Sequence, residues 1–324
     1  MGDDISTRRA THGDLPAVID VARAALGWTD SDAAFLRWKH LGNPYGESPM
    51  WVAESADGVV AFRAFLRWRF RRADGSVVRA VRAVDTATVP AYQGRGIFTR
   101  LTLGALDELR DDGVGIVFNT PNTNSLPGYL KMGWHEVGRL PVVVRPNRWR
   151  FPFTVVTARR AATRDAVPAT VGVPADEVFA DRDALEALLA SVPLRYGFAT
   201  DRTPELYAWR YGNPKLGYRV VHTGSLTDGC AVFRLRRRGR AVEAVVCDVL
   251  APRADVQRTR ELVAAVAQER LADYVIRLGC DGVAAGGFAP VPRLGPLLTC
   301  RPLDGTTAPP AEEWRLSMGD VELL

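Results

Sequence analysis

The sequence has few residues of the kinds that bind structural metals or form disulfides. No two of its cysteines have the C-x-x-C spacing, and its four histidines show no H-x-x-x-H pair. The four cysteines all lie in the second half of the chain: Cys230, Cys247, Cys280 and Cys300. Cysteines without such spacing are typical of small buried side chains. The sequence therefore argues against a disulfide framework and gives no support to a zinc site or any other metal site.

Membrane-spanning and export segments are also missing from the sequence. No apolar run approaches the ~20 residues that cross a bilayer. The chain begins Met1-Gly2-Asp3-Asp4, without the charged and then apolar stretch of a leader. We therefore expect a cytoplasmic protein with no membrane partner. Arginine exceeds lysine, and alanine and valine are abundant, which is typical of a GC-rich bacterial genome.

The residues that are present indicate a folded chain of two domains. Of the 324 residues, 47% are hydrophobic and 24% are charged, and the length exceeds one ordinary domain. The net charge of +5 is modest, although arginines cluster in 67–72 and 234–240. Such clusters are typical of a nucleic-acid groove or of the solvent face of a strand. We favour the strand face and expect no nucleic-acid partner.

The most informative segment is a predicted strand followed by a glycine-containing loop and a helix. Residues 81–89 are β-branched and small, as in a buried strand, and apolar residues recur at helical spacing from Phe98 onward. Gly94 and Gly96 lie between them, with Arg95 placed to add positive charge. A loop that opens a helix presents unpaired backbone N–H groups at the positive end of the helix dipole. The segment therefore predicts a phosphate site.

Two common phosphate loops do not match this segment. No Lys-Ser/Thr pair follows the glycines, as the P-loop requires, and the third glycine of the dinucleotide fingerprint is missing. The segment instead resembles the acyl-CoA pyrophosphate loop of the GCN5-related N-acetyltransferases (the GNAT superfamily), written Q/R-x-x-G-x-G/A. Gln93 and Gly96 match it, whereas Phe98 stands where glycine or alanine is usual. That departure is tolerable if the Phe98 ring turns into the core.

A second GNAT signature follows at the right distance. Residues 115–120 read as another buried strand. The signature N-x-x-A/S-x-x-x-Y-x-x-x-G-F/W is then matched by Asn122, Ser125, Tyr129, Gly133 and Trp134. The resemblance implies that Tyr129 returns a proton to the departing thiolate of coenzyme A, a reaction for which a phenol is suited. The sequences of residues 35–44, 84–90 and 127–134 also resemble those of a bacterial GNAT subgroup.

The resemblance covers residues 1–150 and implies acetyl-CoA or another acyl-CoA as the co-substrate. It also implies that a backbone N–H near Val89 stabilises the thioester oxygen in the transition state. The positions that it implies as cofactor contacts are Thr88, Val89, Gln93, Gly94, Arg95, Gly96, Ile97, Phe98, Asn122 and Ser125.

The general base and the acceptor contacts have several candidates. Asp85 lies on the strand before the loop, where burial would raise the pKa of its carboxyl toward neutrality. The alternative is that Asp85 only fixes the neighbouring backbone. His40 and Glu47 are weaker candidates for the base or for amine binding. Trp38 and Trp209 are candidate acceptor contacts, with ordinary core packing as the alternative.

The second half repeats the order of the first. Residues 206–214 echo 35–44, including the Trp and the Asn-Pro pair. Three strands are predicted after them, at 218–222, 231–237 and 241–250. The loop that follows has no glycine, and Asp255 would lie where phosphate should bind. We therefore expect a duplicated domain that does not bind coenzyme A.

We thus predict an α/β (α+β) protein of two tandem GNAT folds, each a mixed, mostly antiparallel twisted sheet flanked by helices. The predicted units are a catalytic domain at 1–150, a linker at 151–174 and a degenerate domain at 175–324. The degenerate domain either supports the first domain or shapes the acceptor pocket at the boundary. The chain is expected to be a monomer or a homodimer.

The predicted function is transfer of an acetyl or other acyl group from acyl-CoA to the primary amine of a small molecule by direct attack. Three alternatives use the same loop. They are a long-chain acyl-CoA N-acyltransferase of a natural-product pathway, a protein N-acetyltransferase and a non-catalytic acyl-CoA sensor.

Overall fold

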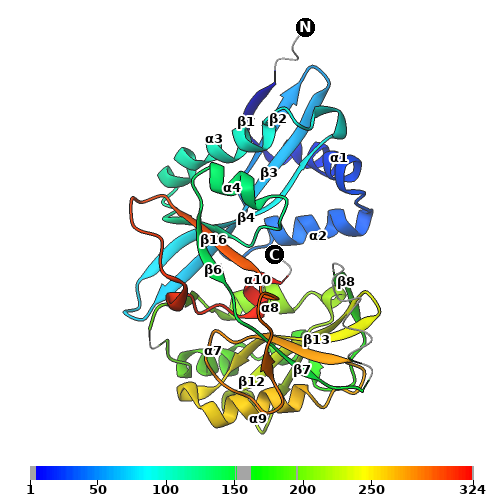
Figure 1. Ribbon diagram of the computed structural model, residues 1–324, viewed down its shortest axis with the longest axis vertical. Helices are drawn as coiled ribbons and strands as arrows, with labels where there is room; N and C mark the ends of the chain where they lie inside the picture. Colours follow the sequence, from blue (N-terminus) through cyan, green and yellow to red (C-terminus); the bar gives the residue numbers. More distant parts are fainter. Residues whose placement is uncertain (1–4, 150, 152–161, 195, 323–324) are drawn as a thin grey trace.

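The computed structural model describes residues 5–149, 151, 162–194 and 196–322 and shows two twisted mixed sheets, each flanked by helices (Figure 1). The first sheet has the strand order β1-β2-β3-β4-β5-β16-β6, and β10 also pairs with β3. Its strands are β1 (Ser6–Arg9), β2 (Met50–Ser55), β3 (Gly58–Arg72), β4 (Val77–Thr88), β5 (Ile116–Asn119), β16 (Leu297–Pro302), β6 (His135–Arg139) and β10 (Phe198–Thr200). The predicted fold class is confirmed.

Helices cover both faces of the first sheet. They are α1 (Leu15–Leu26), α2 (Asp30–Leu41), α3 (Ile97–Asp111) and α4 (Leu126–Lys131). On one face α3 and α4 bury Leu101, Ala105 and Tyr129 against the sheet. On the opposite face α1 and α2 bury Val18 and Leu36. Successive strand side chains point to opposite faces, so Val52 and Phe62 pack under α1 while their neighbours face α3.

The second sheet repeats this layout. Read from its β9 edge, its order is β9-β11-β12-β13-β14-β7-β15, and β8 also pairs with β12. Its strands are β9 (Val173–Pro174), β11 (Arg219–His222), β12 (Cys230–Arg238), β13 (Ala241–Leu250), β14 (Tyr274–Leu278), β7 (Val142–Pro146), β15 (Ala289–Pro290) and β8 (Ala162–Val167). Its helices are α6 (Ala175–Val178), α7 (Arg182–Ser191), α8 (Pro204–Tyr211), α9 (Val256–Val266) and α10 (Met318–Val321). The strands predicted for the second half are confirmed.

The two sheets exchange one strand. In the first sheet β16 lies between β5 and β6, and in the second β7 lies at the matching place between β14 and β15. The chain enters the first sheet at β10, between β9 and β11 of the second sheet, and it also crosses between the sheets after β6 and again before β16. The latter two crossings touch, because Leu140 N–H donates to the Pro296 carbonyl at 3.0 Å. A Cβ at Gly295 would lie 1.8 Å from the Leu140 carbonyl oxygen, so only glycine fits there.

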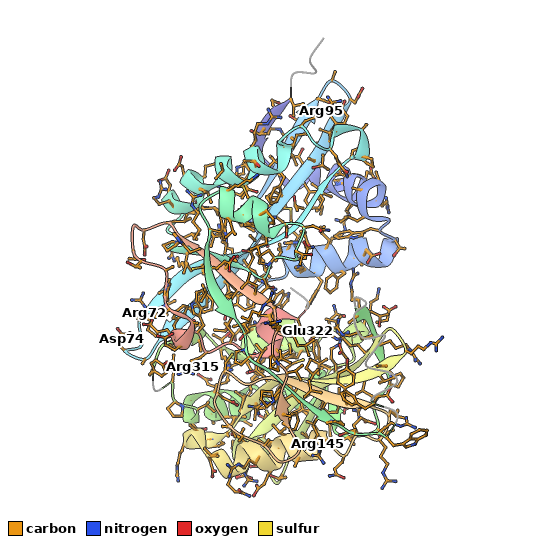
Figure 2. All side chains as sticks on the ribbon, viewed as in Figure 1. Arg72, Asp74, Arg95, Arg145, Arg315 and Glu322 are labelled. Carbon is orange, nitrogen blue, oxygen red and sulfur yellow. The ribbon has the colours of Figure 1, made fainter. Side chains whose placement is uncertain are left out.

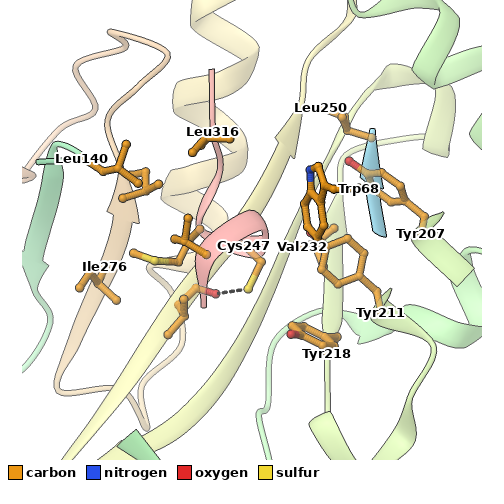
Figure 3. Packing of buried hydrophobic residues seen from close by; sticks show 14 of the residues in the cluster. Trp68, Leu140, Tyr207, Tyr211, Tyr218, Val232, Cys247, Leu250, Ile276 and Leu316 are labelled. Carbon is orange, nitrogen blue, oxygen red and sulfur yellow. Dashed lines mark hydrogen bonds between the residues drawn. The ribbon is translucent and has the colours of Figure 1, made fainter. Parts of the chain in front are cut away.

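This exchange bears on the expected domain limits. Strand β7 falls within 1–150 but pairs in the second sheet, and β16 falls within 175–324 but pairs in the first. The expected linker, 151–174, lies partly outside the described residues, and its described part contributes β8 and β9. One hydrophobic core crosses the boundary: Trp68 of β3 lies beside Tyr207 and Tyr211 of α8 (Figure 3).

In both sheets, two neighbouring parallel strands separate at equivalent positions. Strands β4 and β5 are parallel and pair only over Ala80–Arg82 of β4, although β4 continues to Thr88. Strands β13 and β14 pair only over Glu243–Val245, and β13 continues to Leu250. Beyond these points the two strands diverge, which leaves a wedge in each sheet.

Candidate functional site

A cavity of about 410 Å³ lies at the beginning of α3, between the end of β4 and the end of α1. Most of the predicted loop faces it. The predicted cofactor contacts that line this cavity are Thr88, Gln93, Gly94, Gly96, Ile97 and Phe98. Ala25 and Leu26 of α1 close the opposite side with apolar groups. The loop lies at the end of the first sheet that points away from the second sheet, where Arg95 is labelled (Figure 2).

The loop presents backbone N–H groups to this cavity. Gly96 is the N-cap of α3 with φ 71°, and no side chain caps the helix. Gly94 has φ 75°, so both glycines adopt left-handed backbone that other residues rarely take. A Cβ at either glycine would meet no atom within 4 Å, so the space in front of the loop is open. The uncapped first turn can therefore receive an anion.

The polar side chains of the loop hold its shape. Gln93 donates from Nε2 to the Thr88 carbonyl at 3.0 Å and so closes the loop onto the end of β4. Arg95 donates to the Ala91 carbonyl at 3.2 Å, and its guanidinium lies 4.8 Å from the centre of the Tyr92 ring.

The prediction of an oxyanion donor near Val89 needs a correction at Val89 itself. Its N–H donates to the Val60 carbonyl at 2.9 Å, because β3 still accompanies the chain there. The edge of β4 that faces β5 is different. It has no strand partner beyond Arg82 among the described residues. Backbone groups on that edge, from 83 to 88, are the ones open to a ligand.

Tyr129 lies in α4 and is 4% exposed. Its Oη accepts a hydrogen bond of 2.5 Å from Nη2 of Arg63, a residue of β3 that the sequence analysis missed. The Phe98 ring is half-buried, packs against the core and meets the Tyr129 ring edge to face, with 5.6 Å between ring centres. Phe98 therefore lines the cavity and also contacts the Tyr129 ring. No local motif marks Arg63, because it meets Tyr129 only through the sheet.

Asn122 and Ser125 do not line the cavity. The Asn122 Oδ1 accepts from the backbone N–H of Ser125 at 2.9 Å and from its hydroxyl at 3.1 Å. These bonds fix the beginning of α4 and thereby the position of Tyr129. Their role as cofactor contacts stays a prediction.

Asp85 lies at a bulge in β4, where the pairing with β3 shifts register between Arg63 and Ala64. Two residues of α2 reach its carboxylate. Lys39 Nζ is 2.9 Å from Asp85 Oδ2, and His40 Nε2 is 2.7 Å from the same oxygen. Nε2 is the donor, because the carboxylate has no hydrogen to give.

The predicted direction of the Asp85 pKa was wrong. Burial alone raises this pKa, but the charge of Lys39 and the hydrogen bond from His40 lower it below its ordinary value. Burial lowers the pKa values of Lys39 and His40, and Asp85 offsets that effect only in part. An ionised Asp85 with two donors is a weak proton acceptor near neutrality. Its assignment as the base stays untested.

The remaining candidates lie away from the cavity wall. Glu47 is at the surface, where its carboxylate lies 2.8 Å from His12. Trp38 and Trp209 stack on each other across the boundary of the two sheets, with ring centres 5.0 Å apart. Each indole N–H donates to the backbone carbonyl of the other, at 3.2 Å and 3.0 Å. Because these two hydrogen bonds are reciprocal, α2 and α8 are related by a local two-fold axis.

The matching place in the second sheet differs in its chemistry. A larger cavity, about 510 Å³, lies beside the open ends of β13 and β14. However, Asp255 is the N-cap of α9, and its carboxylate accepts from the Arg258 N–H at 3.0 Å. The helix terminus that would bind phosphate is thus occupied by the chain's own carboxylate.

No group of three or more His, Cys, Asp or Glu side chains in the described ranges is arranged to hold a metal ion. No helix among these residues is both long enough and apolar enough to cross a membrane.

Comparisons with known proteins agree with this geometry. Residues 6–137 match the family model described as acetyltransferase (GNAT) domain. The whole fold is similar to a GCN5-related N-acetyltransferase from Anabaena variabilis ATCC 29413, with 14% identity, TM-score 0.63, and coverage of 93% of this chain and 73% of that one.

Two further solved structures are similar at comparable coverage. For a GCN5-related N-acetyltransferase from Kribbella flavida the identity is 18%, the TM-score 0.58 and the coverage 93% and 72% of the two chains. For Eis1 from Mycobacterium abscessus the values are 16%, 0.56, 93% and 74%. At these identities the likeness concerns the fold. No curated protein matches the chain.

Proposed function

We propose that this chain, whose residues 6–137 match the GNAT acetyltransferase domain, transfers an acyl group from acyl-CoA to the primary amine of a small molecule. The observation that carries the proposal is the uncapped beginning of α3. Gly94 and Gly96 expose its first amides to the cavity, beside the open edge of β4. A diphosphate at those amides would let the pantetheine run along β4 toward Tyr129.

In the proposed reaction the amine nitrogen attacks the thioester carbonyl directly. The carbon–nitrogen bond forms, the nitrogen releases one proton to solvent, the carbon–sulfur bond breaks, and the sulfur leaves as a thiolate. Tyr129 gives its phenolic proton to this sulfur. The site contributes chiefly by holding the two reactants together. We assign Asp85 to support of the β4 bulge, because its lowered pKa suits a permanent charge.

The first prediction separates binding from chemistry. Tyr129→Phe should lower kcat by about 10²-fold, the usual contribution of a general acid, while the affinity for coenzyme A stays nearly unchanged. Calorimetry with coenzyme A and acetyl-CoA measures binding, and release of the free thiol with a panel of amines measures turnover. Tyr196→Phe is the matched control, because Tyr196 is an exposed tyrosine of the second half.

The same assay decides among the alternatives. Amino sugars, other small amines and a peptide are compared as acceptors, and acetyl-CoA is compared with decanoyl-CoA as the donor. Preference for decanoyl-CoA would identify a long-chain transferase, and preference for the peptide a protein N-acetyltransferase. Binding without turnover on any amine would indicate a sensor. Absence of binding heat with either coenzyme would overturn the proposal itself.

A further inference from the structure

Arg63 is a buried cation with an unusual environment. The residue is 1% exposed, and its guanidinium carbon lies 5.0 Å from the ring centre of Phe65, 5.4 Å from that of Phe98 and 5.5 Å from that of Tyr129. Among the ion pairs of the described residues, none includes Arg63. Its Nε is buried without a hydrogen-bond partner. Three aromatic rings thus surround the charge without neutralising it.

Two other buried arginines have carboxylate partners, whereas buried Arg82 donates to the backbone carbonyls of Asp320 and Val321. Arg210 contacts Asp320 at 2.9 Å, and Arg236 contacts Glu322 at 2.8 Å. Such pairing is the usual requirement for burying a charge, because an unpaired ion loses its hydration without compensation. Arg63 therefore has a positive charge with no carboxylate of the described residues at ion-pair distance.

Among the described residues, the one side-chain hydrogen bond of Arg63 goes to the proposed acid. Its Nη2 donates to Tyr129 Oη at 2.5 Å. Because the Tyr129 oxygen accepts this N–H, its own hydroxyl hydrogen points away from Arg63. Phe98 contacts both groups and also lines the cavity, so this cluster borders the cavity proposed for coenzyme A.

We propose that Arg63 is a positioning residue that balances the negative charge of the departing sulfur through Tyr129. The inference rests on the proposed function. As the carbon–sulfur bond breaks, the electron pair goes to sulfur and the Tyr129 hydrogen moves to it. The charge is then shared by the sulfur and the phenol oxygen, and the Arg63 N–H stabilises both arrangements. Solvent later returns a proton to the phenolate.

The test compares coenzyme A with desulfo-coenzyme A, which lacks the thiol. Calorimetry near the thiol pKa of about 8.5 should show wild type binding coenzyme A about tenfold more tightly than the desulfo form. Arg63→Met should bind the two ligands equally, and Arg63→Lys should recover part of the preference. The matched control is Arg67→Met, on the same strand, whose guanidinium pairs with Asp112 at 3.2 Å.

A second measurement needs only the wild type and covers the case in which Arg63→Met does not fold. Calorimetry in two buffers of different ionisation heat counts protons released on binding. Coenzyme A should release more protons than desulfo-coenzyme A, because the site favours the thiolate. Equal release, or an unchanged preference in Arg63→Met, would overturn the role of Arg63. Binding of neither ligand would instead contradict the proposed function.

Turnover supplies a readout that a packing role would not give. Arg63→Met should lower kcat while leaving KM for the acyl donor nearly unchanged, and Arg63→Lys should restore part of kcat. A loss confined to KM would contradict the proposal.

Discussion

At the scale of single residues, two buried cations near the site are compensated differently. Lys39 is 3% exposed and meets the Asp85 carboxylate at 2.9 Å. That pair is complete in the resting protein. Arg63 faces aromatic rings and a phenol, so its charge stays available for an anion that exists only during the reaction. The same sheet therefore carries one structural charge and one proposed for chemistry.

His40 predicts a pH dependence of stability. It is fully buried, and burial lowers its pKa below the ordinary value. The unfolded chain takes up a proton below about pH 6.5, whereas the folded chain does so only at lower pH. The unfolded state thus binds more protons in this window, and stability falls as pH decreases by up to ~1.4 kcal/mol per pH unit.

Urea unfolding between about pH 7.5 and pH 5.5 measures this slope. His40→Gln should flatten it, and His135→Gln, at an exposed position, is the control. An equal slope of unfolding free energy against pH in wild type and His40→Gln would contradict the role of His40.

At the scale of elements, α3 and α9 begin in opposite ways. α3 starts at a glycine with φ 71° and no side-chain cap, whereas Asp255 caps α9. A side-chain cap removes the free-energy cost of unpaired N–H groups at the beginning of a helix. An uncapped helix leaves those N–H groups available to a ligand. This contrast gives a physical reason why only the first of two similar folds is proposed to bind coenzyme A.

Gly96→Ala tests the glycine at the start of α3. Alanine at φ 71° should cost about 1–2 kcal/mol, and the altered amides should weaken coenzyme A binding. Gly104→Ala is the matched control, because Gly104 lies in the same helix with open space around it. That change should stabilise by about 0.5–1 kcal/mol and leave binding intact. Thermal unfolding and calorimetry measure the two effects, and equal binding by both variants would count against the loop.

At the scale of the whole molecule, the strand exchange ties the halves together. Removing β16 would separate β5 from β6, and removing β7 would separate β14 from β15. The core shared by Trp68, Tyr207 and Tyr211 and the stacked Trp38–Trp209 pair add further contacts across the boundary. We therefore expect the two sheets to unfold together, in one transition.

Gly295→Ala probes the crossing of the two exchanged segments. Its Cβ would overlap the Leu140 carbonyl oxygen, which belongs to rigid backbone, so the change should destabilise by about 1–3 kcal/mol. Calorimetric unfolding should show a single transition at lower temperature. Gly286→Ala, where a Cβ meets nothing within 4 Å, is the control. Two separate transitions, or no shift for Gly295→Ala, would contradict the coupling of the sheets.

The sequence by itself determined what short-range patterns specify. Alternation and helical spacing predicted the end of β4, β5, α3 and the three strands β11 to β13, because each depends on neighbours within one element. The glycines of the loop and the place of Tyr129 followed from local motifs.

Only the tertiary structure decided which distant groups meet. The partner of Tyr129 is Arg63, 66 positions away, and the partners of Asp85 lie on α2, so neither the unbalanced guanidinium nor the lowered carboxyl pKa follows from local sequence. The exchange of β7 and β16 is likewise invisible in either strand alone. A strand of either sheet shows the same apolar pattern, and its partner is chosen by the path of the whole chain.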